Sequence, residues 1–436
     1  MASESTFNVP AADRDLVGCP QCDLLQRVPD ASPGEAIRCA RCSEELVHHR
    51  EDALNRTLAL AAAATILYLV ANTVPMIGLS VVGRGASTTV IGGAQHLWNN
   101  GQKVVGALVL FTAVIAPALQ IGLTFAISIG ARRDPVPKWV GPLLRWSGTA
   151  VTWSMIEVML LGVLVALVKI ADYATVIPGT ALFTLGGLVV ILAAMQISLE
   201  RRDIWERIEW LDPSASSQAP YGNAGRGPTA MQQGMQSCET CELLSYPAEP
   251  DAPGRCPRCG GALEFRKTAS LQRTWAFLIA AAVCYIPANM LPVLVTTTAT
   301  GTDSDTILQG VVLLWSPTGW PLSLIVLFAS IMIPSAKILA LGYLLVSVQS
   351  GSVKSNEQRV RLYRMVEIIG RWSMVDVFVD TFTAALVQLQ PLMAVEPGPG
   401  LVFFAAVVVL TMLAVECFDP RLIWDATSSL EASYAQ

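Results

Sequence analysis

Eight of the ten cysteines occur in four Cys-x2-Cys pairs, a spacing that presents two thiolates to one metal ion from a tight turn. Two such pairs complete a tetrahedral shell with each sulfur about 2.3 Å from the ion, which suits zinc. We therefore predict two structural Zn2+ sites, and iron in the same four-sulfur shell is the alternative that the spacing leaves open. The predicted ligands are Cys19, Cys22, Cys39 and Cys42 for the first site, and Cys238, Cys241, Cys256 and Cys259 for the second.

The size of the four-cysteine segments indicates what the metal is for. Each segment is too short to be stable on a hydrophobic core alone, so metal binding should supply its folding free energy. Four sulfurs fill the coordination shell and leave no open position for a substrate, so we expect zinc ribbons and not a catalytic centre. The cysteines therefore give no reason to expect an enzyme.

A second set of candidate functional residues lies inside long apolar stretches, where charged groups are costly and are functional candidates by default. Ser330 and Lys337 are seven residues apart and share one helix face. Ser373, Asp376 and Asp380 follow at spacings of three and four and form one polar stripe. The predicted network consists of Lys337, Asp376, Asp380, Ser330, Ser373 and Thr411, with Glu157 at the repeat position of Asp376 in the first half.

Pairing within this network is expected from the depth of its charges. Lys337 and Asp380 lie at nearly the same level of their helices and Asp376 about one turn away, so Lys337 can pair with either carboxylate. Two interpretations are open: a buried ion pair that fixes helix packing, or a protonatable network that couples proton movement or conformational change to function. In the first half Gln120 stands at the position of Lys337, so we interpret that half as the degenerate, more structural copy.

The composition identifies the elements that carry these residues. Hydrophobic residues make up 53% of the 436 residues and charged residues only 14%, against about 25% charged in soluble domains. The chain is therefore predicted to be an integral membrane protein, and its net charge of −5 does not point to a nucleic-acid partner. The eight stretches long enough to cross a bilayer are Thr57–Leu79, Val104–Gly130, Gly148–Ile170, Thr180–Leu199, Trp275–Val295, Pro321–Val348, Trp372–Leu389 and Leu401–Phe418.

The distribution of Lys and Arg predicts the orientation. The loops after the second and sixth stretches carry four and five of these residues, and the central segment from Glu200 to Arg273 carries nine. The four loops on the other side contain only Arg84 and Lys103. By the positive-inside rule, both termini and the centre are cytoplasmic, a reducing environment that favours metal binding over disulfides.

The chain is also a tandem repeat with an offset of 217 to 219 residues. Asn72-Thr-Val-Pro75 corresponds to Asn289-Met-Leu-Pro292, and this motif either bends the first helix of each half or ends it. We predict an all-α polytopic membrane protein with two tandem four-helix transmembrane modules in parallel orientation, each preceded by a small cytoplasmic zinc ribbon. The predicted domains are 1–56 (first ribbon), 57–199 (first transmembrane module), 200–236 (linker, in which Asp212–Gln236 form a flexible tether), 237–273 (second ribbon), 274–419 (second transmembrane module) and 420–436 (cytoplasmic tail).

The ordered combination of two ribbons, two sets of four spans, the repeated Asn-x-x-Pro and the repeated Trp-Ser-Met resembles the paraquat-inducible protein A family. The resemblance covers nearly the whole chain, from Cys19 to Trp424. It implies a bacterial inner-membrane protein of a Gram-negative envelope, paired with a periplasmic MCE-domain protein that forms a tunnel towards the outer membrane. The polar network of this family carries over onto Ser330, Lys337, Ser373, Asp376 and Thr411.

The resemblance implies a transport component and not an enzyme. Together with its MCE-domain partner, the protein would pass phospholipids or other lipophilic molecules between the inner membrane and the tunnel. Two rival hypotheses remain open at this point. One is a redox membrane protein whose four-cysteine centres hold iron, and the other is a passive membrane anchor for the MCE-domain protein.

Overall fold

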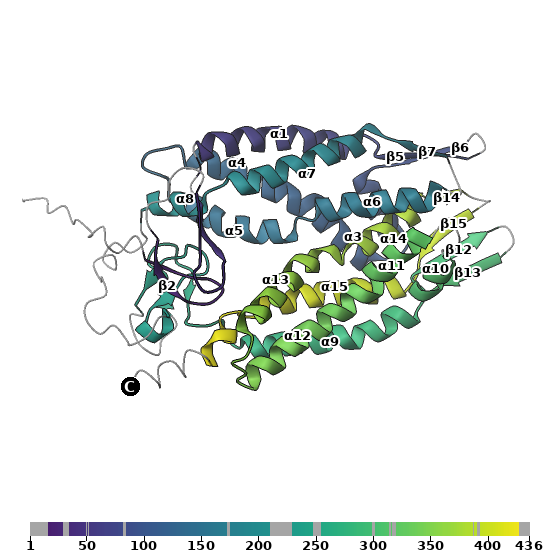
Figure 1. Cartoon of the computed structure of the whole chain (residues 1–436). Helices are drawn as coiled ribbons and strands as arrows, with labels where there is room; N and C mark the ends of the chain where they lie inside the picture. Colours follow the sequence, from purple (N-terminus) through teal and green to yellow (C-terminus); the bar gives the residue numbers. More distant parts are fainter. Residues whose placement is uncertain are drawn as a thin grey trace, which may run out of the picture.

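The computed structural model of the chain places its long helices side by side, with the cysteine segments at one end and short β-sheets at the other (Figure 1). We call these the cysteine end and the sheet end. Most of the predicted linker, residues 210–228, lies outside the described residues, as do the first fifteen residues and the last ten. The structure describes residues 16–28, 35–48, 50, 52–81, 84–171, 175–209, 229–246, 254–298, 301–313, 315, 320–386, 388–389 and 393–426.

Each half opens and closes its membrane part with one long apolar helix and carries shorter helical pieces between them. The N-terminal half contains α1 (Ala53–Thr73), α2 (Val90–Asn99), α3 (Lys103–Leu110), the π-helical turn η2 (Phe111–Ile115), α4 (Ala116–Gly130), α5 (Val140–Trp153), α6 (Ile156–Ala171), α7 (Thr180–Ser198) and α8 (Arg201–Arg207). The C-terminal half contains α9 (Ser270–Met290), α10 (Ile307–Leu313), α11 (Trp320–Leu327), the π-helical turn η5 (Phe328–Met332), α12 (Ile333–Gln349), α13 (Asn356–Trp372), α14 (Val375–Leu386) and α15 (Gly400–Cys417).

Seven helical segments of the described residues are long and apolar enough to cross a membrane. They overlap the predicted stretches except Trp372–Leu389, and that prediction is wrong as a continuous helix. There, α13 ends at Trp372, and α14 begins at Val375 and is 12 residues long. Twelve residues rise about 18 Å, too little to cross a hydrocarbon core of about 30 Å, so the seventh element is a broken helix.

The same break occurs in the N-terminal half. There α5 ends at Trp153 and α6 begins at Ile156, with Ser154 in an extended conformation between them. Both breaks fall on the repeated Trp-Ser-Met sequence, which the apolar pattern alone does not distinguish from a continuous helix. Each broken helix leaves backbone carbonyl groups at its break without intrahelical partners.

Short β-sheets close the sheet end, so the chain is mostly helical and not all-α as predicted. In each half the strand that follows the first helix pairs with the strand that precedes the last helix. Pro75 and Pro292 lie just after α1 and α9, so Asn-x-x-Pro ends the helix at the sheet and does not bend it. The sheet-end strands are β5 (Ile77–Val81), β6 (Arg84–Thr88), β7 (Thr175–Pro178), β12 (Leu294–Thr298), β13 (Gly301–Asp305), β14 (Gln388–Leu389) and β15 (Met393–Pro397).

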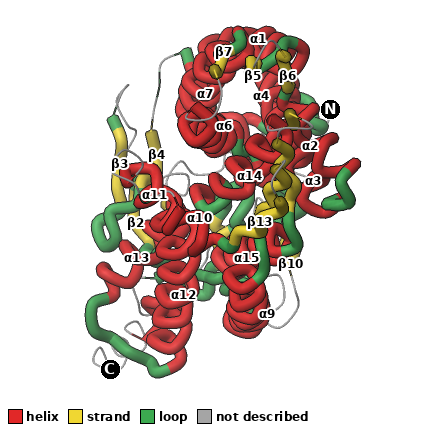
Figure 2. The backbone as a smooth tube through the Cα atoms, turned by 90° about the vertical axis from the view of Figure 1, so that its right-hand side faces the viewer, coloured by secondary structure: helices red, strands yellow, loops and turns green. Residues whose placement is uncertain are grey.

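The two halves meet where α6 packs against α14, two helices at equivalent repeat positions (Figure 2). Their backbones come so close at Gly162 that an added Cβ would lie 2.7 Å from the Cβ of Phe378 and 3.0 Å from the carbonyl oxygen of Val375. One turn further along, α14 packs against α2, where a Cβ at Gly93 would lie 3.1 Å from the ring of Phe382. The helix that carries Asp376 is therefore held by the opposite half of the chain.

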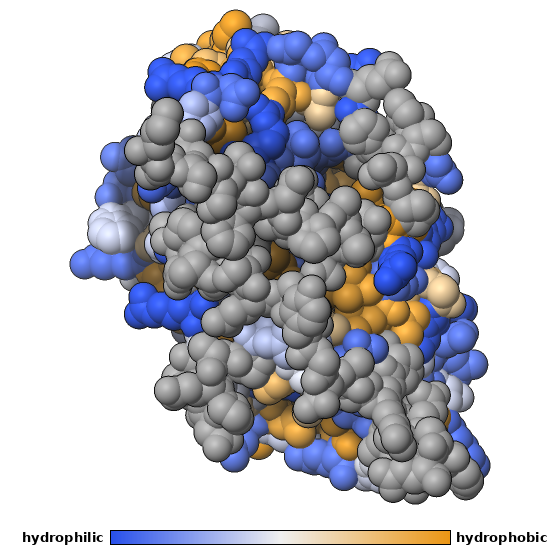
Figure 3. All heavy atoms as spheres, turned by 90° about the vertical axis from the view of Figure 1, so that its left-hand side faces the viewer, coloured by the Kyte–Doolittle hydropathy of each residue, from blue (hydrophilic) through white to orange (hydrophobic). Residues whose placement is uncertain are grey.

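The cysteine segments form two small units at the cysteine end. The first contains β1 (Leu16–Gly18), β2 (Leu25–Arg27), β3 (Ala36–Arg38) and β4 (Glu45–His48), and the second contains β8 (Gln236–Ser237), β9 (Leu244–Ser245), β10 (Gly254–Arg255) and β11 (Ala262–Leu263). We call them the first and second cysteine units. Seen from this end, hydrophilic residues surround several hydrophobic patches among the atoms drawn in colour (Figure 3).

Two pieces of the predicted linker have secondary structure of their own. Arg201–Arg207 form α8, and Met231–Gln233 form a short 3-10 turn beside the first cysteine unit. Backbone contacts hold this turn against the first cysteine unit. Thr229 forms an isolated antiparallel β-bridge with Leu24, and the Ala230 N–H donates to the carbonyl of Asp23 at 3.0 Å. The chain therefore returns to the first unit before it builds the second.

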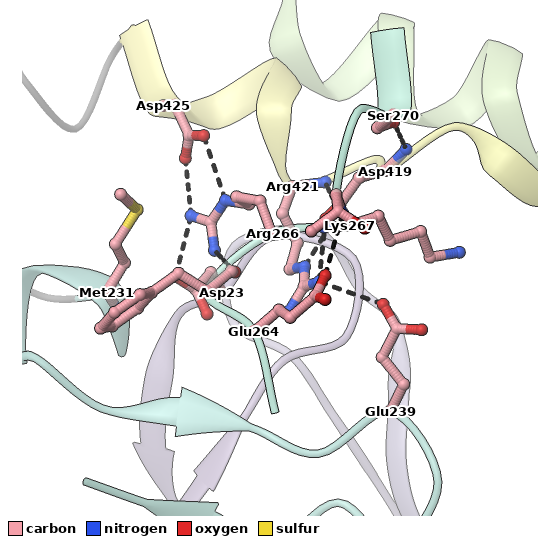
Figure 4. A network of polar contacts seen from close by, with 12 residues as sticks. Asp23, Met231, Glu239, Glu264, Arg266, Lys267, Ser270, Asp419, Arg421 and Asp425 are labelled. Carbon is pink, nitrogen blue, oxygen red and sulfur yellow. Dashed lines mark hydrogen bonds and ion pairs between the residues drawn. The ribbon is translucent and has the colours of Figure 1, made fainter. Parts of the chain in front are cut away.

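A network of charged side chains joins both cysteine units to the end of the chain (Figure 4). The Arg266 guanidinium donates to Asp23 at 3.0 Å and to Asp425 at 2.6 Å. The Arg421 guanidinium donates to Asp419 at 2.8 Å and to Glu239 of the second unit at 3.3 Å. Because Asp23 belongs to the first unit and Asp425 to the last helical turn, residues 422–426, the network holds three segments together.

We predict that Gly162→Ala destabilises the protein because the new methyl group must displace the backbone of α14. Overpacking of this kind costs about 1–3 kcal/mol. The measurement is the free energy of unfolding, or the shift in Tm, of the full chain in detergent. Gly122→Ala is the matched control because a Cβ at Gly122 has no atom within 4 Å. Equal stability of the two variants would contradict the close packing of the halves.

We also predict that the stability of the cysteine end falls in acid through Asp419. Burial opposes ionisation of this carboxyl, but hydrogen bonds from Arg421, the Arg421 charge and the Lys267 N–H hold the pKa of Asp419 below its usual value. The resulting stabilisation is complete above the unfolded-state pKa of about 3.9 and is lost as the pH falls through the lower native pKa. Asp419→Asn should therefore lower Tm at pH 7, and the difference from wild type should shrink below about pH 4. The control is Glu239→Gln, whose side chain is 54% exposed.

Candidate functional site

Each Cys-x2-Cys pair lies on the same backbone turn. The N–H of the residue after the second cysteine donates to the carbonyl of the first cysteine, at 2.8 to 2.9 Å in all four turns. That following residue has a left-handed conformation in every case, and the four residues are Asp23, Ser43, Glu242 and Gly260. The sequence therefore builds four copies of one turn, each of which directs two sulfurs to the same point.

The turns bring the sulfurs together in two groups of four, as the sequence predicted. In the first unit the Sγ atoms of Cys19 and Cys42 are 3.4 Å apart, and in the second unit those of Cys238 and Cys259 are 3.5 Å apart. Within each group all four sulfurs lie within 4.8 Å of one another, and none of these cysteines forms a disulfide. A tetrahedral zinc site needs sulfur–sulfur distances of about 3.8 Å. Both groups therefore fit a metal ion bound by four thiolates.

A buried ammonium group is the centre of the second site. Lys337 lies on α12 and is only 2% exposed. Its Nζ donates to the Thr411 hydroxyl of α15 at 2.8 Å, to the Ser373 hydroxyl at 3.3 Å and to the Gly370 carbonyl at 3.4 Å. Gly370 is near the end of α13, where helix carbonyls have no intrahelical partner. The break between α13 and α14 thus supplies two of the three hydrogen bonds of the ammonium.

The carboxylates of the predicted network lie on α14, directly after this break. Asp376 is in the first turn of α14 and is 7% exposed, and Asp380 is half-buried one turn later. The three described hydrogen bonds of the ammonium go to neutral groups, and the pairing of Lys337 with Asp376 or Asp380 stays a prediction.

The remaining predicted residues fall on both sides of this centre. Ser330 is buried in the π-helical turn η5, about two turns before Lys337 on the same continuous helix. Thr411 contacts the ammonium as the family resemblance implied. Glu157, in contrast, is exposed at the start of α6 although Asp376 at the equivalent position is buried. The structure therefore assembles Lys337, Ser373 and Thr411 and leaves Glu157 outside.

The equivalent centre of the N-terminal half is neutral. Gln120 occupies the repeat position of Lys337 and is 1% exposed, and neither of its amide atoms has a hydrogen-bond partner among the described residues. A neutral amide is far less costly to bury than a charge, so this position tolerates incomplete hydrogen bonding. The two halves share one framework and differ in charge at its centre.

Two tyrosines that the sequence reasoning missed position the helix of Lys337 and its counterpart. The Tyr285 hydroxyl donates to the carbonyl of Ile331 in the turn η5 at 3.1 Å, and the Tyr68 hydroxyl donates to the carbonyl of Val114 in η2 at 2.8 Å. A π-helical turn inserts one residue into a helix and leaves carbonyls to be satisfied from outside. The signal in the sequence is the identity of Tyr68 and Tyr285 at the repeat offset, four residues before the asparagine of Asn-x-x-Pro.

The family model described as "Paraquat-inducible protein A" matches residues 54–209 and again residues 271–428. The chain belongs to the paraquat-inducible protein A family. The two matched stretches begin at the first long helix of each half and do not include either cysteine unit. One family model thus matches both halves separately, and the resemblance predicted from the motifs is confirmed.

Known members of this family align with nearly the whole chain. The lipophilic envelope-spanning tunnel protein A of Escherichia coli K12 is 32% identical over 96% of this chain and 93% of its own length. The intermembrane transport protein PqiA of the same organism is 32% identical over 93% of this chain and 95% of its own length. A probable intermembrane transport protein of Haemophilus influenzae is 26% identical over 94% of this chain and 95% of its own length. No solved structure matches the chain.

We predict that the purified full chain contains two zinc ions and that Cys22→Ser lowers the content to about one, because three sulfurs remain in the first unit. The measurement is elemental analysis of the protein in detergent. Cys284→Ser is the control because Cys284 lies in α9, away from both groups, and two ions should remain. Two iron ions and a visible chromophore would contradict the zinc prediction and favour the redox hypothesis.

Proposed function

We propose that this protein is the inner-membrane component of an intermembrane lipid transport system. It passes phospholipids or other lipophilic molecules between the inner membrane and a periplasmic MCE-domain partner. The names of the relatives, which describe intermembrane transport and an envelope-spanning tunnel, support this proposal, as do the seven apolar helices. The same names favour a transport protein over an enzyme.

The proposal includes an orientation. The cysteine end faces the cytoplasm with both termini, and the sheet end faces the periplasm, where the partner docks. Arg132, Arg133 and Lys138 between α4 and α5, and Lys354 between α12 and α13, support this orientation, since both loops lie at the cysteine end. Zinc in both cysteine units, in a reducing compartment, is part of the same proposal.

The single observation that carries the mechanism is the buried ammonium of Lys337 beside a broken helix. Its three described hydrogen bonds depend on how α13, α14 and α15 are placed around α12. Gain or loss of a proton at Asp376, in the first turn of α14, changes the electrostatic energy of that ammonium. We propose that this protonation switches the packing of the C-terminal half between two states and so couples the proton gradient to lipid movement.

The N-terminal half has a different role in this proposal. Its centre is the neutral Gln120, and its counterpart of Asp376 is the exposed Glu157. Gln120 does not titrate, and Glu157 is exposed, so neither of these two positions offers a buried titratable group. We propose that it acts as the static support of α14, through the close contact of Gly162 with Phe378.

We predict that Asp376→Asn and Lys337→Met each lower phospholipid transfer at least tenfold, because each removes one charge of the switch. The measurement is transfer of a fluorescent phospholipid from proteoliposomes, under an imposed proton gradient, to the purified MCE-domain partner. Glu157→Gln is the matched control and should retain transfer close to the wild-type rate. If correctly folded Asp376→Asn and Lys337→Met proteins transfer lipid at the wild-type rate, the network is structural and proton coupling through it is wrong.

A further inference from the structure

The two four-cysteine groups pack on the opposite halves of the chain, although Glu239 at the edge of the second unit contacts Arg421 of the C-terminal half. The four cysteines of the first unit share a hydrophobic cluster with the C-terminal half, and those of the second unit share one with the N-terminal half. The other members of the first cluster include Leu341, Leu344 and Leu345 of α12, Val360 and Tyr363 of α13, and Val415 of α15. The other members of the second cluster include Ile127 of α4, Val140 and Leu144 of α5, and Trp205 of α8.

Polar contacts of the first unit follow the same crossed pattern. Glu44 forms an ion pair of 2.7 Å with Arg364 of α13, and both side chains are less than one third exposed. The Arg41 guanidinium lies 4.6 Å from the ring centre of Trp424, in the last helical turn of the C-terminal half. Arg41 and Glu44 lie within two positions of the ligand Cys42 in the sequence. The turn that holds the metal is thus the turn that contacts the C-terminal half.

The Glu44–Arg364 ion pair and a hydrogen bond of the buried ammonium lie on the same helix, α13. Arg364 and Gly370 lie on one helix, less than two turns apart, and the Gly370 carbonyl accepts a hydrogen bond from Lys337. A helix transmits a displacement at one end to the other because its backbone is rigid over such lengths. The position of the first unit on α13 therefore affects one of the three groups that solvate Lys337.

We propose that metal binding in the first cysteine unit sets the position of α13 and thereby the Lys337 site in the C-terminal half, whereas metal in the second unit acts on the N-terminal half. The first unit is then a metal-responsive regulator of the half that carries the buried charge. A four-cysteine unit of this size folds only with its ion, so loss of metal releases its contacts with α13. This inference adds regulation to the proposed transport function, but the structural coupling exists independently of lipid.

The test is hydrogen–deuterium exchange of the full chain in lipid nanodiscs, with Cys22→Ser compared with Cys241→Ser. We expect Cys22→Ser to raise exchange in α13 at least tenfold and to leave α5 at the wild-type rate. Cys241→Ser should raise exchange in α5 at least tenfold and leave α13 at the wild-type rate. Wild-type exchange of α13 in Cys22→Ser, or equal changes in α5 and α13, would overturn the proposal.

A second set of variants keeps the metal and removes only the contact. Glu44→Arg should raise exchange in α13, and the double variant Glu44→Arg with Arg364→Glu should restore it, with two metal ions per chain in both proteins. Arg361→Gln is the matched control because Arg361 is exposed on the same helix. If hydrogen–deuterium exchange in α13 stays raised in the double variant, the Glu44–Arg364 ion pair does not couple the first cysteine unit to α13.

Lipid transfer is measured separately on the same variants. If Asp376→Asn loses transfer but Cys22→Ser does not change exchange in α13, the proposed regulation is contradicted and the transport proposal stands. If Cys22→Ser changes exchange in α13 but Asp376→Asn transfers lipid at the wild-type rate, the coupling stands and the proton-coupled function is contradicted. The two proposals therefore fail in distinguishable ways.

Discussion

A single desolvated ammonium group constrains the architecture of the C-terminal half. Removing a charge from water costs many kcal/mol unless the protein supplies hydrogen bonds in place of hydration. Lys337 obtains them from Thr411 of α15, from Ser373 in the break and from the Gly370 carbonyl at the end of α13. An unbroken helix would use that carbonyl for its own backbone, so the break and the buried charge depend on each other.

The repeat explains why this solution occurs once. Both halves have the break at Trp-Ser-Met, the π-helical turn and the tyrosine that caps it. In the N-terminal half, where Gln120 replaces the lysine, the break is kept although no charge requires it. There the break places α6 against α14 of the other half, with Gly162 at the closest approach. One framework thus provides a charged site in one copy and a support in the other.

Local patterns in the sequence predicted the features that local patterns determine. The spacing of the cysteines predicted both four-sulfur groups. Of the eight predicted apolar stretches, seven overlap helices of the described residues that are long enough to cross a membrane. The break at Ser373 could not be predicted because the polar residues of Trp372–Leu389 follow a helical spacing that is also expected of one continuous helix. The break depends on a lysine far away in sequence. The crossed packing of the cysteine units was equally inaccessible, since Glu44 and Arg364 meet only through tertiary structure.

The equivalent positions of the two π-helical turns indicate the order of events in the duplication of the chain. A π-helical turn amounts to one inserted residue, which rotates everything after it by about 100° around the helix axis. Phe111–Ile115 and Phe328–Met332 stand at the same repeat position, 217 residues apart, so the insertion was present in the ancestral unit before it was duplicated. The difference between Gln120 and Lys337 arose after that event, on helices that already pointed this position inward. The shared helix geometry is therefore older than the difference in charge between the two centres.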